Sequence, residues 1–117
     1  MTSGKSWLKC LKKSGLAVET APDGQEAVDR CCRAMLEEKP FHAVIVDLKV
    51  PGGMGGVDAL RELKKVDDSV KVIACSADLN DPAARHYEQF GFCAFIPKPA
   101  DWQTITRIVH SVILPSA

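Results

Sequence analysis

Residues 41–56 read FHAVIVDLKVPGGMGG, and this stretch decides the fold. Its apolar run ends in Asp47, and a turn rich in glycine and proline follows within a few residues. A short apolar run that is rich in β-branched residues and bounded by a turn is typical of a strand buried on both faces. We therefore expect a strand over residues 42–47 inside a parallel sheet, with Asp47 at its carboxyl end.

The chain on either side of this strand alternates between apolar runs and helical patterns. The other strands are predicted at residues 16–21, 70–76 and 93–96. The helices are predicted at residues 6–14, 25–38, 57–65 and 82–90, and from residue 101 onwards. Such alternation predicts an α/β fold in which helices cover a parallel sheet. A length of 117 residues suits a single domain over residues 1–117.

The last helix has the clearest amphipathic pattern. One stripe, expected to be buried, contains Trp102, Ile105, Ile108, Val109 and Val112. The positions expected nearer solvent are Gln103, Arg107 and His110.

Composition excludes several classes of function. Fifteen basic and fifteen acidic side chains balance, so net charge gives no support for a nucleic-acid partner. A basic cluster at Lys5, Lys9, Lys12 and Lys13 has the spacing of a solvated helix face. The apolar runs are too short to span a bilayer and no apolar signal region opens the chain, so we expect no membrane insertion and a cytoplasmic location.

Cysteine and histidine positions give no sign of a disulfide framework or a zinc site. The five cysteines are odd in number and form no C-x-x-C pair. The three histidines, His42, His86 and His110, fall on different predicted elements. We expect reduced thiols and no histidine metal site.

Three polar side chains close or follow predicted parallel strands. Asp47 ends AVIVD, Ser76 ends VIACS, and Lys98 follows the last strand in FIPKP. Functional groups of open parallel sheets collect beyond the carboxyl ends of the strands, so we expect these three side chains to converge. A carboxylate nucleophile, a hydroxyl and an ammonium group suit phosphoryl transfer to the carboxylate.

On these residues the sequence resembles the receiver domains of response regulators and hybrid histidine kinases. The resemblance covers about residues 8–112 and includes GLAVETAPDGQEAV, the block around Asp47, VKVIACSAD and YEQFGFCAFIPKP. The form VDLKVPGGMGG looks most like receivers at the C-termini of hybrid sensor kinases. The resemblance implies a flavodoxin-like three-layer sandwich and a histidine kinase or phosphotransfer domain as partner.

The resemblance also implies a role for each site residue. Asp47 would be the phosphoacceptor, Lys98 the phosphate contact, Ser76 the switch hydroxyl and Phe95 the switch aromatic. Asp47 and the backbone carbonyl of Lys49 would ligate Mg²⁺. A purely structural role stays open for two of these residues, because Ser76 could instead cap a strand or turn and Phe95 could instead belong to the core.

The sequence departs from the family at its front. Family members begin with an apolar strand ending in two acidic residues that hold magnesium, whereas here no Asp or Glu precedes Glu19. The expected sheet therefore has four strands instead of five, without the central one. We expect three possible outcomes: the strands at residues 16–21 and 42–47 close up, another chain covers the gap and gives a homodimer, or the sequence is a fragment. For the same reason we expect the chain to bind magnesium poorly and to be phosphorylated slowly, if at all, by small donors.

Three functions compete at this point. The first is a phosphoacceptor receiver in a phosphorelay, which is a signalling module and not an enzyme. The second is a degenerate receiver that binds partners without phosphorylation. The third is an aspartyl-phosphate hydrolase, which is disfavoured because Lys49 stands where that chemistry usually has a second carboxylate.

Overall fold

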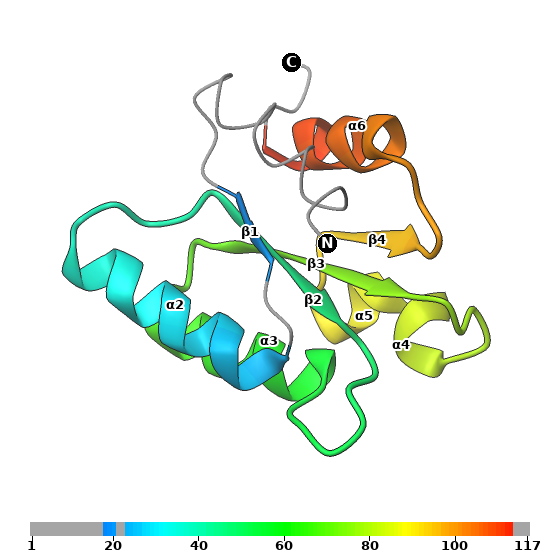
Figure 1. The fold of residues 1–117 in the computed structure, drawn as a ribbon, viewed down its shortest axis with the longest axis horizontal. Coiled ribbons are helices and arrows are strands. Elements are labelled where there is room, and N and C mark those ends of the chain that lie inside the picture. Colours follow the sequence, from blue (N-terminus) through cyan, green and yellow to red (C-terminus); the bar gives the residue numbers. More distant parts are fainter. Residues whose placement is uncertain (1–17, 21–22, 114–117) are drawn as a thin grey trace, which may run out of the picture.

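The computed structural model describes residues 18–20 and 23–113, which form helical layers around a parallel sheet (Figure 1). The predicted helix at residues 6–14 and the basic cluster lie outside the described residues. The strands are β1 (Val18–Thr20), β2 (Ala43–Asp47), β3 (Lys71–Ser76) and β4 (Ala94–Pro97). The helices are α2 (Gly24–Leu36), α3 (Gly56–Val66), α4 (Pro82–Arg85), α5 (Tyr87–Phe90) and α6 (Trp102–Ile113).

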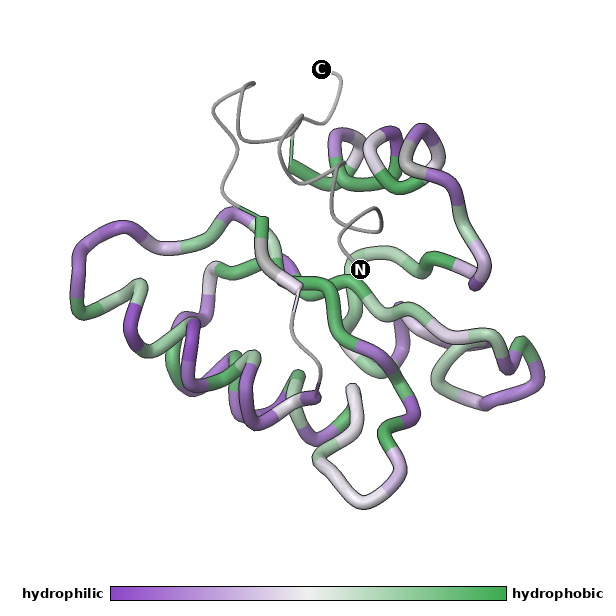
Figure 2. Tube along the Cα trace, viewed as in Figure 1, coloured by the Kyte–Doolittle hydropathy of each residue, from purple (hydrophilic) through white to green (hydrophobic). Residues whose placement is uncertain are grey.

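Alternate residues of β2 and β3 face opposite sides of the sheet, as the pleat of a strand requires. Val44 and Val72 belong to a core shared with α2 and α3. Ile45 and Ile73 belong to a second core, which Val109 of α6 completes from the other side. Figure 2 shows the hydrophobic colour along the central strands and more hydrophilic segments on the outer helices. This is the flavodoxin-like three-layer arrangement that the sequence predicts.

The strand order in the described residues is β1-β2-β3-β4, and all neighbours are parallel. β1 pairs directly with β2, with Val18 opposite Ala43 and Thr20 opposite Ile45. Of the three outcomes expected for the gap, the structure has the one in which these two strands close up. The direct pairing satisfies backbone groups on the inner edge of β1 that would otherwise lack partners.

Asp23 caps α2 as expected, because its Oδ1 accepts the amide N–H of Glu26 at 2.9 Å. The predicted end of this helix at residue 38 is wrong. α2 ends at Leu36, and Glu38 has a φ of 59°, a left-handed conformation that cannot continue a right-handed helix.

The predicted helix at residues 82–90 is also wrong in one respect, since it is two short helices. Asp81 caps α4 and Gly91, with a φ of 112°, ends α5, as expected. Between them, His86 has φ −126° and ψ 42°, which lies outside the helical region and interrupts the hydrogen-bond ladder.

The α6 pattern is confirmed in most respects. Ile105, Ile108 and Val112 pack on the buried Val109 core, whereas Gln103 and Arg107 are exposed. The prediction for His110 is wrong, because the residue is half-buried and its Nε2 is enclosed. The side chain of Trp102 lies outside the described set. No helix in the described parts of the chain is long and apolar enough to cross a membrane.

Candidate functional site at the carboxyl edge of the sheet

Asp47 is held at the carboxyl edge by the strand that precedes it. The first four residues of β2 are buried and Asp47 is half-buried, so the strand is anchored while its last side chain reaches the surface. The backbone N–H of Lys49 donates to Asp47 Oδ1 at 3.3 Å, which orients the carboxylate. The position suits a nucleophile that must meet a donor from outside.

Lys98 reaches the same place from β4. Its backbone N–H donates to the carbonyl of Ser76 at 2.9 Å, which continues the pairing of β3 with β4 past the last register pair, Ser76 and Pro97. The Lys98 Nζ contacts Asp47 Oδ2. This hydrogen bond raises the pKa of the Lys98 ammonium, although partial burial opposes the shift. The structure thus brings together two of the three predicted side chains.

Ser76 lies at the end of β3 and is only 3% exposed. Its Oγ accepts the backbone N–H of Asp78 at 3.0 Å. The hydroxyl therefore holds the loop after β3 in this structure, which matches the turn-capping role left open for it. No hydrogen bond joins Ser76 to Asp47 in the described residues.

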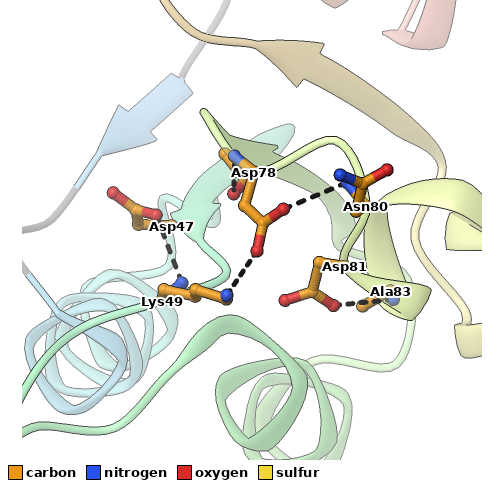
Figure 3. Close-up of polar contacts among 7 residues, drawn as sticks. Asp47, Lys49, Asp78, Asn80, Asp81 and Ala83 are labelled. Carbon is orange, nitrogen blue, oxygen red and sulfur yellow. Dashed lines mark hydrogen bonds and ion pairs between the residues drawn. The ribbon is translucent and has the colours of Figure 1, made fainter.

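An ion pair that the sequence did not predict joins the loops after β2 and β3. Lys49 Nζ lies 2.5 Å from Asp78 Oδ2, and Figure 3 shows the two side chains pointing toward each other beside Asp47. The hydrogen bond raises the pKa of Lys49 and lowers the pKa of Asp78. A signal did exist, because each residue stands two positions past the end of one of two neighbouring parallel strands.

A cavity of about 280 Å³ opens beside Asp47 on the α6 side of the sheet. Thr20, Cys75 and Lys98 line it together with Asp47, and apolar side chains such as Ile45 and Ile105 form the rest. Burial raises the pKa of the Cys75 thiol to about 11, so this thiol is protonated near neutral pH. Neither Thr20 nor Cys75 was predicted as a site residue. Strand alternation predicts which face of the sheet each side chain occupies, but not the shape of the cavity beside that face.

Phe95 lies on β4 away from the Asp47 carboxylate. Its ring stacks on Tyr87 of α5, with centroids 6.3 Å apart and planes at 22°. Both rings are half-buried and pack against the α2 and α3 core. The contact links β4 to α5, and it is compatible with either of the roles left open for Phe95.

The described residues at this edge fit a magnesium ion poorly. Magnesium takes oxygen ligands in near-octahedral geometry, whereas the groups that contact the Asp47 carboxylate are the Lys98 ammonium and the Lys49 backbone N–H, and the carboxylates of Asp78 and Asp81 act on the Lys49 ammonium. No group of three His, Cys, Asp or Glu side chains able to hold a metal occurs among the residues that the structure describes. The backbone carbonyl of Lys49 stays a predicted ligand.

Comparisons with known proteins agree with this fold. Residues 3–110 match the family described as the response regulator receiver domain. The chain is 38% identical over 95 residues to the sensory/regulatory protein RpfC of Xanthomonas campestris pv. campestris, a match that covers 78% of the chain and 12% of RpfC. It is 31% identical to the chemotaxis protein CheY of Thermotoga maritima, covering 87% of the chain and 81% of CheY.

A solved structure shows the same fold. The receiver domain of the sensor histidine kinase PA1611 from Pseudomonas aeruginosa PAO1 was crystallised with a magnesium ion in its active site cleft. It superposes with a TM-score of 0.69 at 22% identity, covering 97% of this chain and 90% of that one. Because the chain spans about an eighth of RpfC, similarity to that protein concerns one domain only.

Proposed function

This chain belongs to the response regulator receiver domain family, and we propose that it accepts a phosphoryl group on Asp47 from a histidine kinase or a phosphotransfer domain. The contact between Lys98 and Asp47 at the carboxyl edge of the sheet carries the proposal. The contact places a cation next to the carboxylate, where it can stabilise the negative charge that develops on the phosphoryl oxygens during transfer. We also propose that the module signals from the cytoplasm and is not an enzyme with turnover.

The transfer is a displacement at phosphorus. A carboxylate oxygen of Asp47 forms the new P–O bond while the P–N bond of a phosphohistidine breaks. The departing imidazole nitrogen keeps the electron pair and takes up a proton from solvent. Lys98 then donates to a phosphoryl oxygen in place of Asp47 Oδ2, so the ammonium stays paired throughout.

Ser76 can couple phosphorylation of Asp47 to a conformational change in the loop that follows β3. Its hydroxyl can leave the backbone N–H of Asp78 and donate to a phosphoryl oxygen, which frees the loop between β3 and α4. Phe95, stacked on Tyr87, lies on β4 opposite Ala74 of β3 and would follow such a movement. The face formed by α5, β4 and α6 is the one we propose partners recognise.

A second candidate is a receiver that binds partners without phosphorylation. The observation that favours it is the poor fit of this edge to magnesium, which removes a large share of the usual charge neutralisation. Asp47 and Lys98 would then serve as a structural ion pair. The two candidates differ in one observable, the covalent state of Asp47 after exposure to a donor.

The test is a transfer assay with a phosphorylated histidine phosphotransfer domain as donor, read by intact mass. We expect the wild-type chain to gain the mass of one phosphoryl group and Asp47→Asn to gain none. Asp58→Asn is the matched control, because Asp58 is an exposed carboxylate on α3 whose ion pair is with Arg61 of the same helix. A wild-type chain that stays unmodified while the donor phosphorylates another receiver would support the second candidate.

A further inference from the structure

Asp78 is the residue through which the loop after β3 is tied to its surroundings. Its Oδ2 contacts Lys49 Nζ, and its Oδ1 accepts the backbone N–H of Asn80 at 3.0 Å. Its own backbone N–H donates to Ser76 Oγ at 3.0 Å. Figure 3 shows the Lys49 and Asn80 contacts converging on the Asp78 side chain. Of these three contacts, the Lys49 ion pair is the one that crosses to the loop that follows Asp47.

The backbone of Lys49 already lies next to the proposed phosphoacceptor, since its N–H donates to Asp47 Oδ1 at 3.3 Å. Its side chain is 58% exposed, so the ammonium group is free to move through solvent. Lysine carries this charge on a flexible four-carbon stem. The ammonium that now contacts Asp78 can therefore swing to a group attached to Asp47 without movement of the backbone.

A phosphoryl group on Asp47 changes the relative stability of two positions of the Lys49 ammonium, one at Asp78 and one at Asp47. It adds up to about two negative charges and three acceptor oxygens next to the Lys49 backbone. Asp78 offers a carboxylate on an exposed loop, with a weaker attraction from Asp81, and an ion pair in such a place is worth little. The Lys49 ammonium should therefore bind the modified Asp47 in preference to Asp78. Because the described residues at this edge fit magnesium poorly, Lys49 would be a second cation next to Lys98.

Resting on the proposed phosphorylation of Asp47, we propose that the Lys49–Asp78 ion pair is a latch on the β3–α4 loop that phosphorylation opens. Lys49 moves from Asp78 to the phosphoryl group, where it is a second cation beside Lys98. Asp78 loses the ion pair that joins it to the neighbouring loop. The loop from Asp78 to α4 becomes freer to open, which adds to any change at Ser76.

The latch can be tested first in the unmodified protein, by NMR solvent exchange at the backbone amides of Asp78, Asn80 and Asp81. Asp78→Asn removes the charge but keeps an Oδ1 to accept the Asn80 N–H, and Lys49→Met keeps the stem but removes the ammonium. We expect each variant to speed exchange roughly two- to fivefold, the size of an exposed ion pair. The double variant should exchange no faster than either single one. Asp58→Asn, which breaks the Arg61 pair on α3, should leave these amides unchanged.

The second arm repeats the measurement on the phosphorylated chain, with the modification confirmed by mass. Phosphorylation should speed exchange at the same amides in the wild type and add little in Lys49→Met. Additive effects of the two single variants, or a phosphorylated wild type whose loop amides exchange at the unmodified rate, overturn the latch. If no donor adds mass to the wild type, the proposed function fails instead. The opening step then fails with it, and the unmodified variants alone decide whether the ion pair holds the loop.

Discussion

The ammonium group of Lys98 contacts the carboxylate of Asp47 although 51 residues separate them in the chain. The contact exists because β2, β3 and β4 are adjacent and parallel, so that the ends of β2 and β4 meet at one edge across β3. A carboxylate and a neighbouring cation are the groups that transfer of a phosphoryl group to an aspartate needs.

Removing the ammonium of Lys98 should slow phosphorylation of Asp47. We expect Lys98→Met to lower the transfer rate roughly 100-fold or more, the usual effect of losing one donor that stabilises charge in a transition state. The initial rate of mass gain with a phosphorylated phosphotransfer domain measures this. Lys39→Met, at an exposed lysine after α2, is the control. Equal rates for Lys98→Met and the wild type would contradict the role given to Lys98.

The α/β alternation, the parallel sheet and the meeting of Asp47 with Lys98 could be predicted, because each depends on local periodicity and on which end of a strand a residue occupies. The break at His86 and the early end of α2 could not. They depend on single backbone conformations, such as the φ of 59° at Glu38, that composition does not encode. The direct pairing of β1 with β2 was one of three outcomes that the sequence allowed.

The Lys49–Asp78 ion pair and the cavity beside Asp47 were missed for a different reason. Both depend on how two loops and α6 sit over the strand ends, and this depends on the register of β2 against β3. Register places Cys75 opposite Asp47, and from it the proximity of the two following loops could be inferred. Side-chain direction within the loops is set by packing that the sequence pattern does not show.

A pair of leucines tests the packing of the core. Leu63 of α3 is fully buried between α3 and the sheet, whereas Leu36 at the end of α2 is 85% exposed. We expect Leu63→Ala to lower the free energy of unfolding by about 2–5 kcal/mol. Leu36→Ala should change it by less than about 0.5 kcal/mol. Urea denaturation followed by circular dichroism measures both, and similar losses in the two variants would show the assigned core to be wrong.

The cysteines should differ in reactivity with an alkylating reagent. Because burial raises the pKa of Cys75 to about 11, its reactive thiolate is scarce near neutral pH, whereas Cys93 is exposed. Peptide mapping after timed iodoacetamide treatment should find Cys93 modified well before Cys75. The free energy of unfolding should also depend on pH through Cys75. The contribution from its raised pKa is fully present below the ordinary thiol pKa of 9.0 and is lost as pH rises through about 11. Equal labelling rates in the native protein would contradict the burial of Cys75; labelling in urea supplies the control.

Magnesium should bind weakly, since among the described residues Asp47 is paired with the Lys98 ammonium and Asp78 with the Lys49 ammonium. Isothermal titration calorimetry should give little heat for the wild type. Thr20→Asp adds a carboxylate to the cavity that Asp47 also lines, so it should tighten binding. Asp68→Asn, a change at an exposed carboxylate outside this cavity, should have no effect. Tight binding by the wild type, unaltered by Thr20→Asp, would contradict the poor fit described above.

The location of the phosphoryl group is the most direct test of the account. An aspartyl phosphate can be reduced with borohydride to homoserine, which marks the modified residue permanently for peptide sequencing by mass spectrometry. After incubation with a phosphorylated histidine phosphotransfer domain, we predict homoserine at position 47 and at no other aspartate. Homoserine at a different aspartate, or none in a chain that has consumed the donor, would contradict the assignment of Asp47 as the phosphoacceptor.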